Sequence, residues 1–79
     1  MHYVYILESQ SEAGRYYVGL TNDLRQRFAD HNAGKSVHTS KFRPWILATY
    51  IAFASAAKAR SFEFYLKSGS GRAFAKKHF

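Results

Sequence analysis

The chain contains no cysteine, which excludes two common ways of stabilising a small protein. Its 79 residues can form neither disulfide bonds nor a cysteine zinc site, and four histidines scattered along the sequence are a poor substitute ligand set. We therefore expect a single domain, residues 1–79, with a core held by packing alone. An aromatic content of 18% supports this, because each aromatic side chain buries about 150–250 Å².

Acidic residues are also scarce. Five Asp and Glu residues stand against twelve Lys and Arg residues, which gives a formal net charge of +7. This excess favours a polyanionic partner, and nucleic acid is the partner that the charge predicts; a solvated basic surface or a ribosome-associated protein is the alternative. So few acids favour one bound divalent metal ion over a two-metal site.

No hydrophobic run approaches the roughly 20 residues that are needed to span a bilayer. The first residues have the composition of a β-strand rather than that of a signal peptide. The sequence therefore predicts a cytoplasmic protein with no membrane partner.

The order of apolar, aromatic and polar segments predicts an α/β protein of the α+β type, with element order ββαβαα. The most continuously apolar strand, residues 45–53, is predicted to be central in the sheet. Residues 35–44 are polar and basic without a clear period, which predicts a surface loop. The predicted strands span residues 3–7, 16–20 and 45–53, and the predicted helices span residues 24–33, 55–67 and 72–78.

The first helix carries unusual residues in the stripe that should face the sheet. Leu24, Arg27, Phe28 and His31 follow the spacing of a buried helical face, yet two of the four are charged or titratable. Either residue alone is compatible with a packing role, because Arg27 can extend its charge to solvent and His31 can be a hydrogen-bonded core histidine. Together on one face, directly after two tyrosine-rich strands, they indicate a site for a phosphate group.

The second helix has a similar anomaly at Glu63. This carboxylate shares the stripe with apolar residues, and an unpaired buried charge costs several kcal/mol. One interpretation is an ion pair with Arg27, Arg60 or Lys67. The other is a ligand for a hard divalent cation, Mg²⁺ or Mn²⁺, which prefers oxygen donors.

Two short tyrosine motifs now become informative. Tyr3-Val4-Tyr5 and Tyr17-Val18-Gly19 resemble the two elements that name the GIY-YIG nuclease superfamily, with substitutions in both. The stretch from Gly19 to Asn32 is similar to the helix that follows in that family, and Glu63 falls where the family has its metal-binding glutamate. The resemblance covers essentially the whole chain and is closest to the small, single-domain branch.

The resemblance implies a central three-stranded antiparallel sheet flanked by helices, and hydrolysis of DNA phosphodiester bonds with one divalent metal ion. It implies that Tyr5 and Tyr17 position or activate the attacking water, that Arg27 stabilises phosphate charge, and that Glu63 ligates the metal. His31 would assist proton transfer or brace the site. A function in DNA repair or recombination is an expectation of the same kind.

The sequence also predicts a protein partner and leaves two alternative functions open. Larger members of the superfamily obtain specificity from an attached domain, so we expect this chain, as a monomer or weak dimer, to depend on a protein partner for specificity. One alternative is a binding module of the same fold without turnover. Another is a protein-interaction domain with an exposed patch of Phe64, Tyr65, Phe74 and Phe79. The residues that we expect to contact the DNA backbone are Lys35, His38, Lys41, Arg43 and Lys67.

Overall fold

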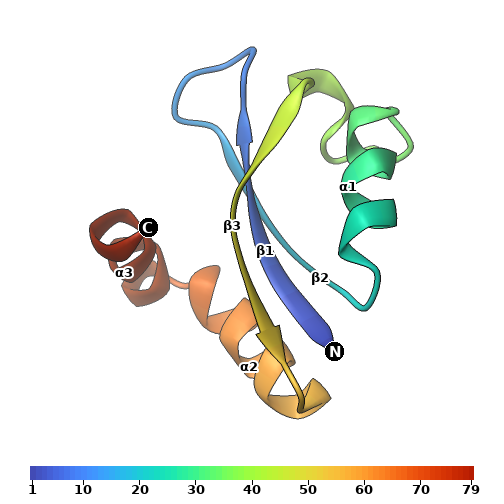
Figure 1. Cartoon of the computed structure of the whole chain (residues 1–79). Helices are drawn as coiled ribbons and strands as arrows, with labels where there is room; N and C mark the ends of the chain where they lie inside the picture. The colour runs from blue at the N-terminus through green and yellow to red at the C-terminus, as the bar shows by residue number, and fades with distance from the viewer.

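The computed structural model describes all 79 residues and confirms the predicted α+β fold (Figure 1). Its order is ββαβαα, with one additional short 3-10 helix before the third strand. The strands are β1 (His2–Ser9), β2 (Tyr16–Thr21) and β3 (Trp45–Phe53), and the helices are α1 (Leu24–Asn32), the 3-10 helix η1 (Ser40–Phe42), α2 (Ala56–Leu66) and α3 (Gly69–His78). None of these helices has the length and apolar character needed to cross a membrane.

The sheet is antiparallel with strand order β2-β1-β3, so the prediction that residues 45–53 form the central strand was wrong. The central strand is β1, in which Val4, Tyr5, Ile6 and Leu7 are all buried. Strand β3 instead alternates between more and less exposed residues along its whole length, as expected of an edge strand with one covered face. Continuous burial, rather than continuous apolar composition, marks the central strand.

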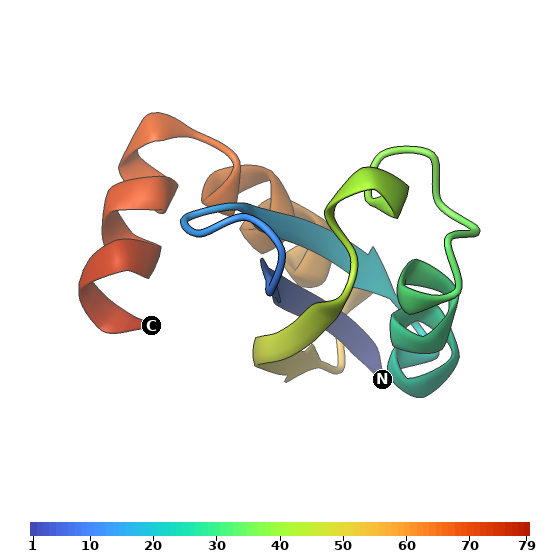
Figure 2. The ribbon, with the colours of Figure 1, turned by 90° about the horizontal axis from the view of Figure 1, so that it is seen from above.

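The two faces of the sheet are covered by different helices. Helix α1 lies over one face, and α2 with α3 lies on the other, as the two views in Figures 1 and 2 show. Side chains on a strand alternate between faces, so β1 contributes to two separate cores. Val4 and Ile6 pack with Ala59 of α2, whereas Tyr5 and Leu7 pack with Trp45 beneath α1.

The third helix begins earlier than predicted, at Gly69 rather than at residue 72. The Ser68 hydroxyl accepts a hydrogen bond from the Gly71 amide at 3.1 Å, which caps the helix and converts a glycine-rich segment into its first turn. Gly71 is buried where α3 meets α2, and a Cβ there would overlap the Tyr65 carbonyl. The glycine permits this close approach of the two helices.

Two other surface predictions need correction. Residues 35–44 were predicted to be a surface loop, but Ser36 and Thr39 are buried within it. The predicted aromatic patch is also incomplete, because Phe74 packs against the core beneath α2 instead of facing solvent with Phe64. The loop therefore contributes to the interior of the α1 face, and the aromatics of the C-terminal half are partly structural.

Candidate active site

A buried chain of hydrogen bonds joins β1, α1 and the connection that follows α1. The Tyr5 hydroxyl lies 2.8 Å from His31 Nε2, and His31 Nδ1 lies 2.8 Å from the Thr39 hydroxyl. Their relative exposures are 1% for Tyr5 and 0% for both His31 and Thr39. A neutral imidazole donates through one nitrogen and accepts through the other, so the two hydroxyls must take opposite roles.

Gly19 explains how Tyr5 reaches this position. Tyr5 and Gly19 are paired across β1 and β2, and a Cβ at residue 19 would overlap both the ring and the hydroxyl of Tyr5. Without that Cβ, the Tyr5 ring lies across the backbone of β2 toward the edge of the sheet. Tyr5 can therefore occupy this position only because the residue opposite it, in the Tyr17-Val18-Gly19 motif, is a glycine.

Tyr17 completes an aromatic cluster around His31. Its ring centroid lies 5.0 Å from that of His31 and 6.3 Å from that of Tyr5, and the rings are tilted at 58° and 45°. The Tyr17 side chain is only partly buried, in contrast to the two residues that it contacts. The cluster therefore opens to solvent at Tyr17, on the β2 edge strand.

Burial and neighbouring charge hold Tyr5 in its neutral form. Burial raises the pKa of Tyr5 to about 12, and Tyr17 and, more weakly, the Glu63 carboxylate act in the same direction. The Arg27 guanidinium opposes this shift. Tyr17, Arg27 and Glu63, three of the other four predicted catalytic residues, thus all influence the pKa of Tyr5, with Glu63 the weakest of them.

His31 is also held neutral. Burial lowers its pKa, the positive charge of Arg27 lowers it further, and Asp30 acts weakly in the opposite direction. The fifth predicted residue thus lies at the centre of the cluster, where it can exchange hydrogen bonds but carries no charge at neutral pH. Arg27 is partly buried on the same helix, so a single positive charge lies beside two neutral polar groups.

A second set of contacts fixes Thr39. The Trp45 indole donates a hydrogen bond to the Thr39 carbonyl at 2.9 Å. The Asn32 side chain holds the Trp45 backbone from both sides, accepting from its amide at 2.6 Å and donating to its carbonyl at 2.9 Å. The segment after α1 is therefore anchored to the start of β3, which holds the Thr39 hydroxyl against His31.

Glu63 approaches from α2, on the opposite face of the sheet. Its side chain is 18% exposed and pairs with Lys67, one helical turn away, through one carboxylate oxygen. The ion-pair interpretation of this residue therefore holds with Lys67 rather than with Arg27 or Arg60. The other carboxylate oxygen has no partner in the chain and remains available as a ligand.

The donor set fits a divalent cation that is held only in part by protein. No group of three or more His, Cys, Asp or Glu side chains comes together anywhere in the chain. Mg²⁺ commonly binds through one carboxylate while retaining waters and substrate phosphate oxygens. Glu63, with Tyr5 and Tyr17 nearby, matches that mode and does not match a cage built entirely from protein.

The predicted DNA-contacting residues fall into two places. Four of them lie in or beside the connection between α1 and β3, where Lys35 also forms an ion pair with Asp30 at 3.6 Å. Lys67 lies on α2 beside Glu63, across the sheet from this group. The four predicted residues in the connection, all of them exposed, are Lys35, His38, Lys41 and Arg43.

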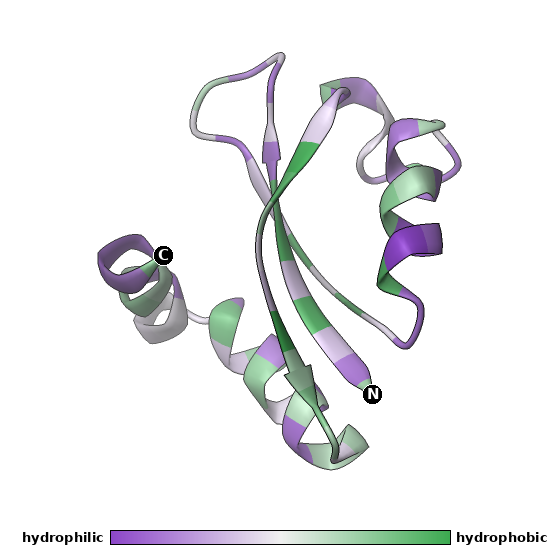
Figure 3. Cartoon of the chain, in the orientation of Figure 1, coloured by the Kyte–Doolittle hydropathy of each residue, from purple (hydrophilic) through white to green (hydrophobic).

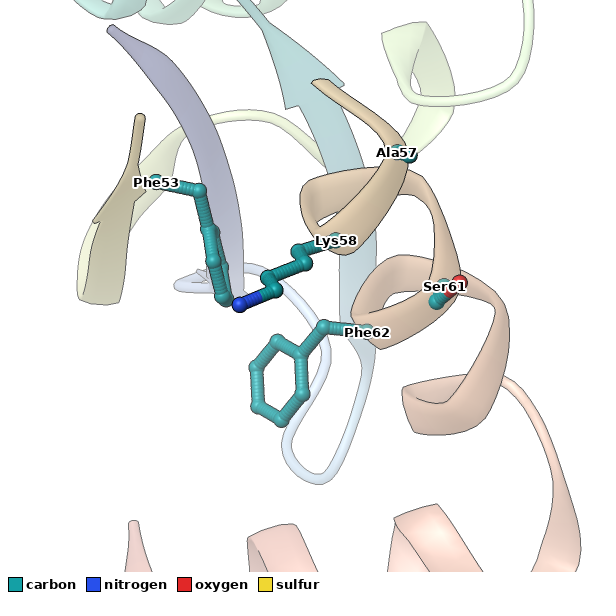
Figure 4. Close-up of a pocket in the computed structure, with 5 residues that line it drawn as sticks. All are labelled: Phe53, Ala57, Lys58, Ser61 and Phe62. Carbon is teal, nitrogen blue, oxygen red and sulfur yellow. The ribbon is translucent and has the colours of Figure 1, made fainter. Parts of the chain in front are cut away.

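The hollows of the surface lie away from this cluster. One of about 450 Å³ is formed by Phe53 at the end of β3 and by residues of α2, and Figure 4 shows the Lys58 side chain extending toward Phe53 beside the Phe62 ring. It contains no carboxylate, imidazole or phenol. The tyrosine and histidine cluster is instead a packed structure with one open side, which suits contact with a large substrate.

Comparison with known proteins identifies the family. The model of the GIY-YIG catalytic domain matches residues 1–77. The chain belongs to the GIY-YIG family. The family is named for the two tyrosine motifs, and the residues Tyr5, Tyr17 and Gly19 of these motifs form the cluster described above.

Individual relatives are small GIY-YIG proteins named UPF0213. A UPF0213 protein of Streptococcus pneumoniae is 41% identical over 66 residues, covering 82% of this chain and 65% of the relative. One of Halobacterium salinarum is 37% identical over 68 residues, covering 85% and 86%. The solution NMR structure of a UPF0213 protein from Bacillus halodurans matches with a TM-score of 0.58 and 36% identity, covering 95% of this chain and 79% of the other. The chain thus spans about two thirds of the streptococcal protein and most of the others.

Two residues of the site were not predicted from the sequence. Thr39 lies in a segment without a hydrophobic period, so no sequence pattern singles it out. Its role follows only from the buried Nδ1 of His31, which needs a hydrogen-bond partner. Asn32 follows His31 at the end of α1, where an asparagine is ordinarily read as a helix terminator. The signal available in advance was the buried histidine itself, because a buried imidazole needs two hydrogen-bond partners.

Proposed function

We propose that this GIY-YIG protein is a divalent-metal-dependent endonuclease that hydrolyses phosphodiester bonds of DNA. The observation that carries the proposal is the buried chain of Tyr5, His31 and Thr39, which opens at Tyr17 and is flanked by a guanidinium and a carboxylate. Phosphodiester hydrolysis needs an oriented nucleophile and stabilisation of charge on the phosphate oxygens. The cluster supplies groups for both tasks.

Tyr5 acts as a hydrogen-bonding group rather than as a free phenolate. With a pKa of about 12, its hydroxyl stays protonated at neutral pH. It can orient a water molecule or a phosphate oxygen while His31 fixes the position of the hydroxyl. Tyr17, on the open side, contributes a second phenol toward the substrate.

Arg27 and Glu63 supply the charged groups. Arg27 stabilises negative charge on the non-bridging phosphate oxygens, for which a planar guanidinium is well suited. Glu63 would hold the divalent cation, which would supply Lewis-acid stabilisation of negative charge on the phosphate oxygens. The basic residues Lys35, His38, Lys41, Arg43 and Lys67 contact the DNA backbone, and a protein partner provides specificity.

A second candidate function is binding to DNA without cleavage. The Glu63–Lys67 ion pair favours it, because this contact offsets the negative charge with which Glu63 would bind a metal ion. In that case the net charge of +7 supports DNA binding that is independent of metal.

The test is cleavage of supercoiled, single-stranded and branched DNA with Mg²⁺, with Mn²⁺ and with chelator. Glu63→Gln keeps the size of the side chain and removes the charge. Glu12→Gln is the matched control, because Glu12 is paired with Arg15 on the exposed hairpin loop. We expect metal-dependent product from the wild type and Glu12→Gln, and almost none from Glu63→Gln. DNA binding by all three proteins without product would support the second candidate.

A further inference from the structure

A second hollow, of about 420 Å³, lies on the same face of the sheet as the catalytic cluster. The sheet contributes Tyr3, Leu47 and Tyr50, and α1 covers the hollow from the other side with Phe28. The polar members Asn22, Asp23 and Arg25 come from the connection between β2 and α1 and from the first turn of α1. The Asp23 carboxylate is engaged in capping α1, where it accepts a hydrogen bond from the Gln26 amide. Neither the family match nor the proposed mechanism gives the residues of this hollow a role.

Helix α1 separates this hollow from the catalytic cluster. Successive residues of an α-helix are rotated by about 100°, so Arg25 and Arg27 project to opposite flanks when Leu24, Phe28 and His31 face the sheet. Arg27 lies on the flank of Tyr5 and Tyr17, and Arg25 lines the hollow. One helix thus presents a guanidinium on each side.

The hollow contains aromatic rings and uncommitted polar groups. The Tyr3 and Tyr50 rings meet edge to face, with centroids 6.1 Å apart and an interplanar angle of 62°. Tyr50 is 54% exposed, so part of its ring surface is open to a ligand. The Asn22 amide and the Arg25 guanidinium form no side-chain hydrogen bond or ion pair within the chain. Their hydrogen-bonding capacity is therefore free for a bound molecule.

The ligand chemistry that fits these groups is that of an unpaired nucleobase. Bases of single-stranded nucleic acid stack on tyrosine rings and arginine planes, and their edges exchange hydrogen bonds with amides. The volume lies in the range of small-ligand sites. A peptide would need no aromatic pair, whereas the net charge of +7 and the guanidinium at the rim both favour the polyanion that carries bases.

We propose that the hollow between Tyr3, Tyr50 and Arg25 binds an unpaired nucleotide of the DNA substrate. The inference rests on the proposed function and adds a substrate class: DNA with a single-stranded segment beside the bond that is cleaved. Tyr3 and Tyr5 are two residues apart on one face of β1, so their Cα atoms are roughly 7 Å apart. That distance equals the rise of about two stacked nucleotides along a strand. The hollow is therefore within reach of a strand whose phosphate lies at Tyr5.

The experiment measures binding in chelator, so that it does not depend on cleavage. A fluorescein-labelled oligothymidylate and a blunt duplex of the same length are each titrated by fluorescence anisotropy with wild type, Tyr50→Ala and Arg25→Gln. We expect Tyr50→Ala to weaken binding to the single strand by about five-fold or more, the magnitude of losing one base stack, and to change binding to the duplex by less than about two-fold. Arg25→Gln should weaken binding to the single strand more than binding to the duplex.

Two matched controls separate the hollow from general effects. Tyr16→Ala removes a tyrosine of similar exposure, 56%, outside the hollow, and Arg60→Gln removes an exposed positive charge from α2. Tyr50 lies on the surface of an edge strand, so Tyr50→Ala is expected to fold, and Arg25→Gln provides the second variant.

The outcomes distinguish this inference from the proposed function. Equal losses for single strand and duplex, or no loss for either, would overturn the nucleotide site while leaving the nuclease intact. The second of these results would assign the hollow to another occupant, such as a second copy of this chain. Failure of the wild type to bind any DNA would overturn both the site and the proposed function.

Discussion

The two faces of the sheet are built from different chemistry. Beneath α2, the fully buried residues Val4, Ile6, Ala59 and Leu66 are all aliphatic, and partly buried phenylalanines pack against them. Beneath α1, the buried residues are Tyr5, Leu7 and Trp45 together with a fully buried histidine and threonine. Figure 3 colours each residue by its hydropathy, and the residues of α1 are more hydrophilic than those of α2.

The contrast indicates a division of tasks within a very small domain. Aliphatic side chains pack favourably without a hydrogen-bond partner. The α2 face can therefore stabilise the fold without burying polar groups that need partners. Every polar group beneath α1 must instead be hydrogen-bonded, and the chain leaves none of its buried side-chain polar atoms unsatisfied. Changes on the two faces should therefore separate stability from activity.

The largest expected loss of stability comes from Leu66→Ala on the α2 face. Leu66 is 3% exposed, and truncation of a buried leucine costs about 2–5 kcal/mol. Urea denaturation measures the loss, and cleavage per folded molecule should not change. Ile6→Val, expected to cost about 0.5–1.5 kcal/mol, keeps the test available if Leu66→Ala does not fold. A fall in cleavage per folded molecule with either variant would contradict the division of tasks.

Gly19→Ala should damage both properties, because it acts on the α1 face. The added Cβ overlaps the Tyr5 ring and hydroxyl, and overpacking of this kind costs about 1–3 kcal/mol. Displacement of the hydroxyl should also abolish cleavage by the folded fraction. Gly69→Ala is the matched control, since no atom lies within 4 Å of its added Cβ. Wild-type cleavage by Gly19→Ala would show that the position of Tyr5 is unimportant.

Thr39→Val tests the hydrogen bond to His31. Valine has the shape of threonine without the hydroxyl, so His31 Nδ1 loses its partner in a fully buried position. We expect a loss of about 1–2 kcal/mol in the free energy of unfolding, with partial recovery in Thr39→Ser. Equal stability of Thr39→Val and the wild type would mean that the bond contributes nothing to the fold.

The smallest expected effect is the dependence of stability on pH that His31 contributes. Its pKa is lowered in the folded state, so between that value and the ordinary 6.5 the unfolded chain binds more protons. The contribution of His31 is therefore complete above about pH 6.5 and is lost as the pH falls, by at most about 1.4 kcal/mol per pH unit. Urea midpoints at several pH values, compared with those of His31→Gln, measure it. Identical pH profiles for the two proteins would contradict the buried neutral histidine.

Local sequence patterns predicted the element order, but not the strand order. The spacing in α1 correctly placed His31 in the interior, since a helical period is a local property. The central strand was assigned incorrectly because residues 45–53 are the most continuously apolar run, whereas the continuously buried strand is β1. Which strand lies in the middle depends on pairing between distant segments. The composition of one segment does not determine that pairing.

The steric and hydrogen-bonding partners of the site were also beyond sequence reasoning. Gly19 and Thr39 matter because of Tyr5 and His31, which lie on other elements. Neither residue belongs to a periodic pattern that would indicate its role. The catalytic roles of Tyr5, Tyr17, Arg27, His31 and Glu63 stay predictions, and the geometry adds that Tyr5, Tyr17 and His31 form one aromatic cluster.

The most direct test of the account compares Tyr5→Phe with Leu66→Ala in single-turnover cleavage, each normalised to its folded fraction. Tyr5→Phe keeps the ring and removes only the hydroxyl that bonds to His31. We predict that it lowers the cleavage rate by about 100-fold or more, the usual contribution of a positioned proton donor or acceptor, while Leu66→Ala cleaves at the wild-type rate. Comparable rates for Tyr5→Phe and the wild type would contradict the assignment of the α1 face as the active site.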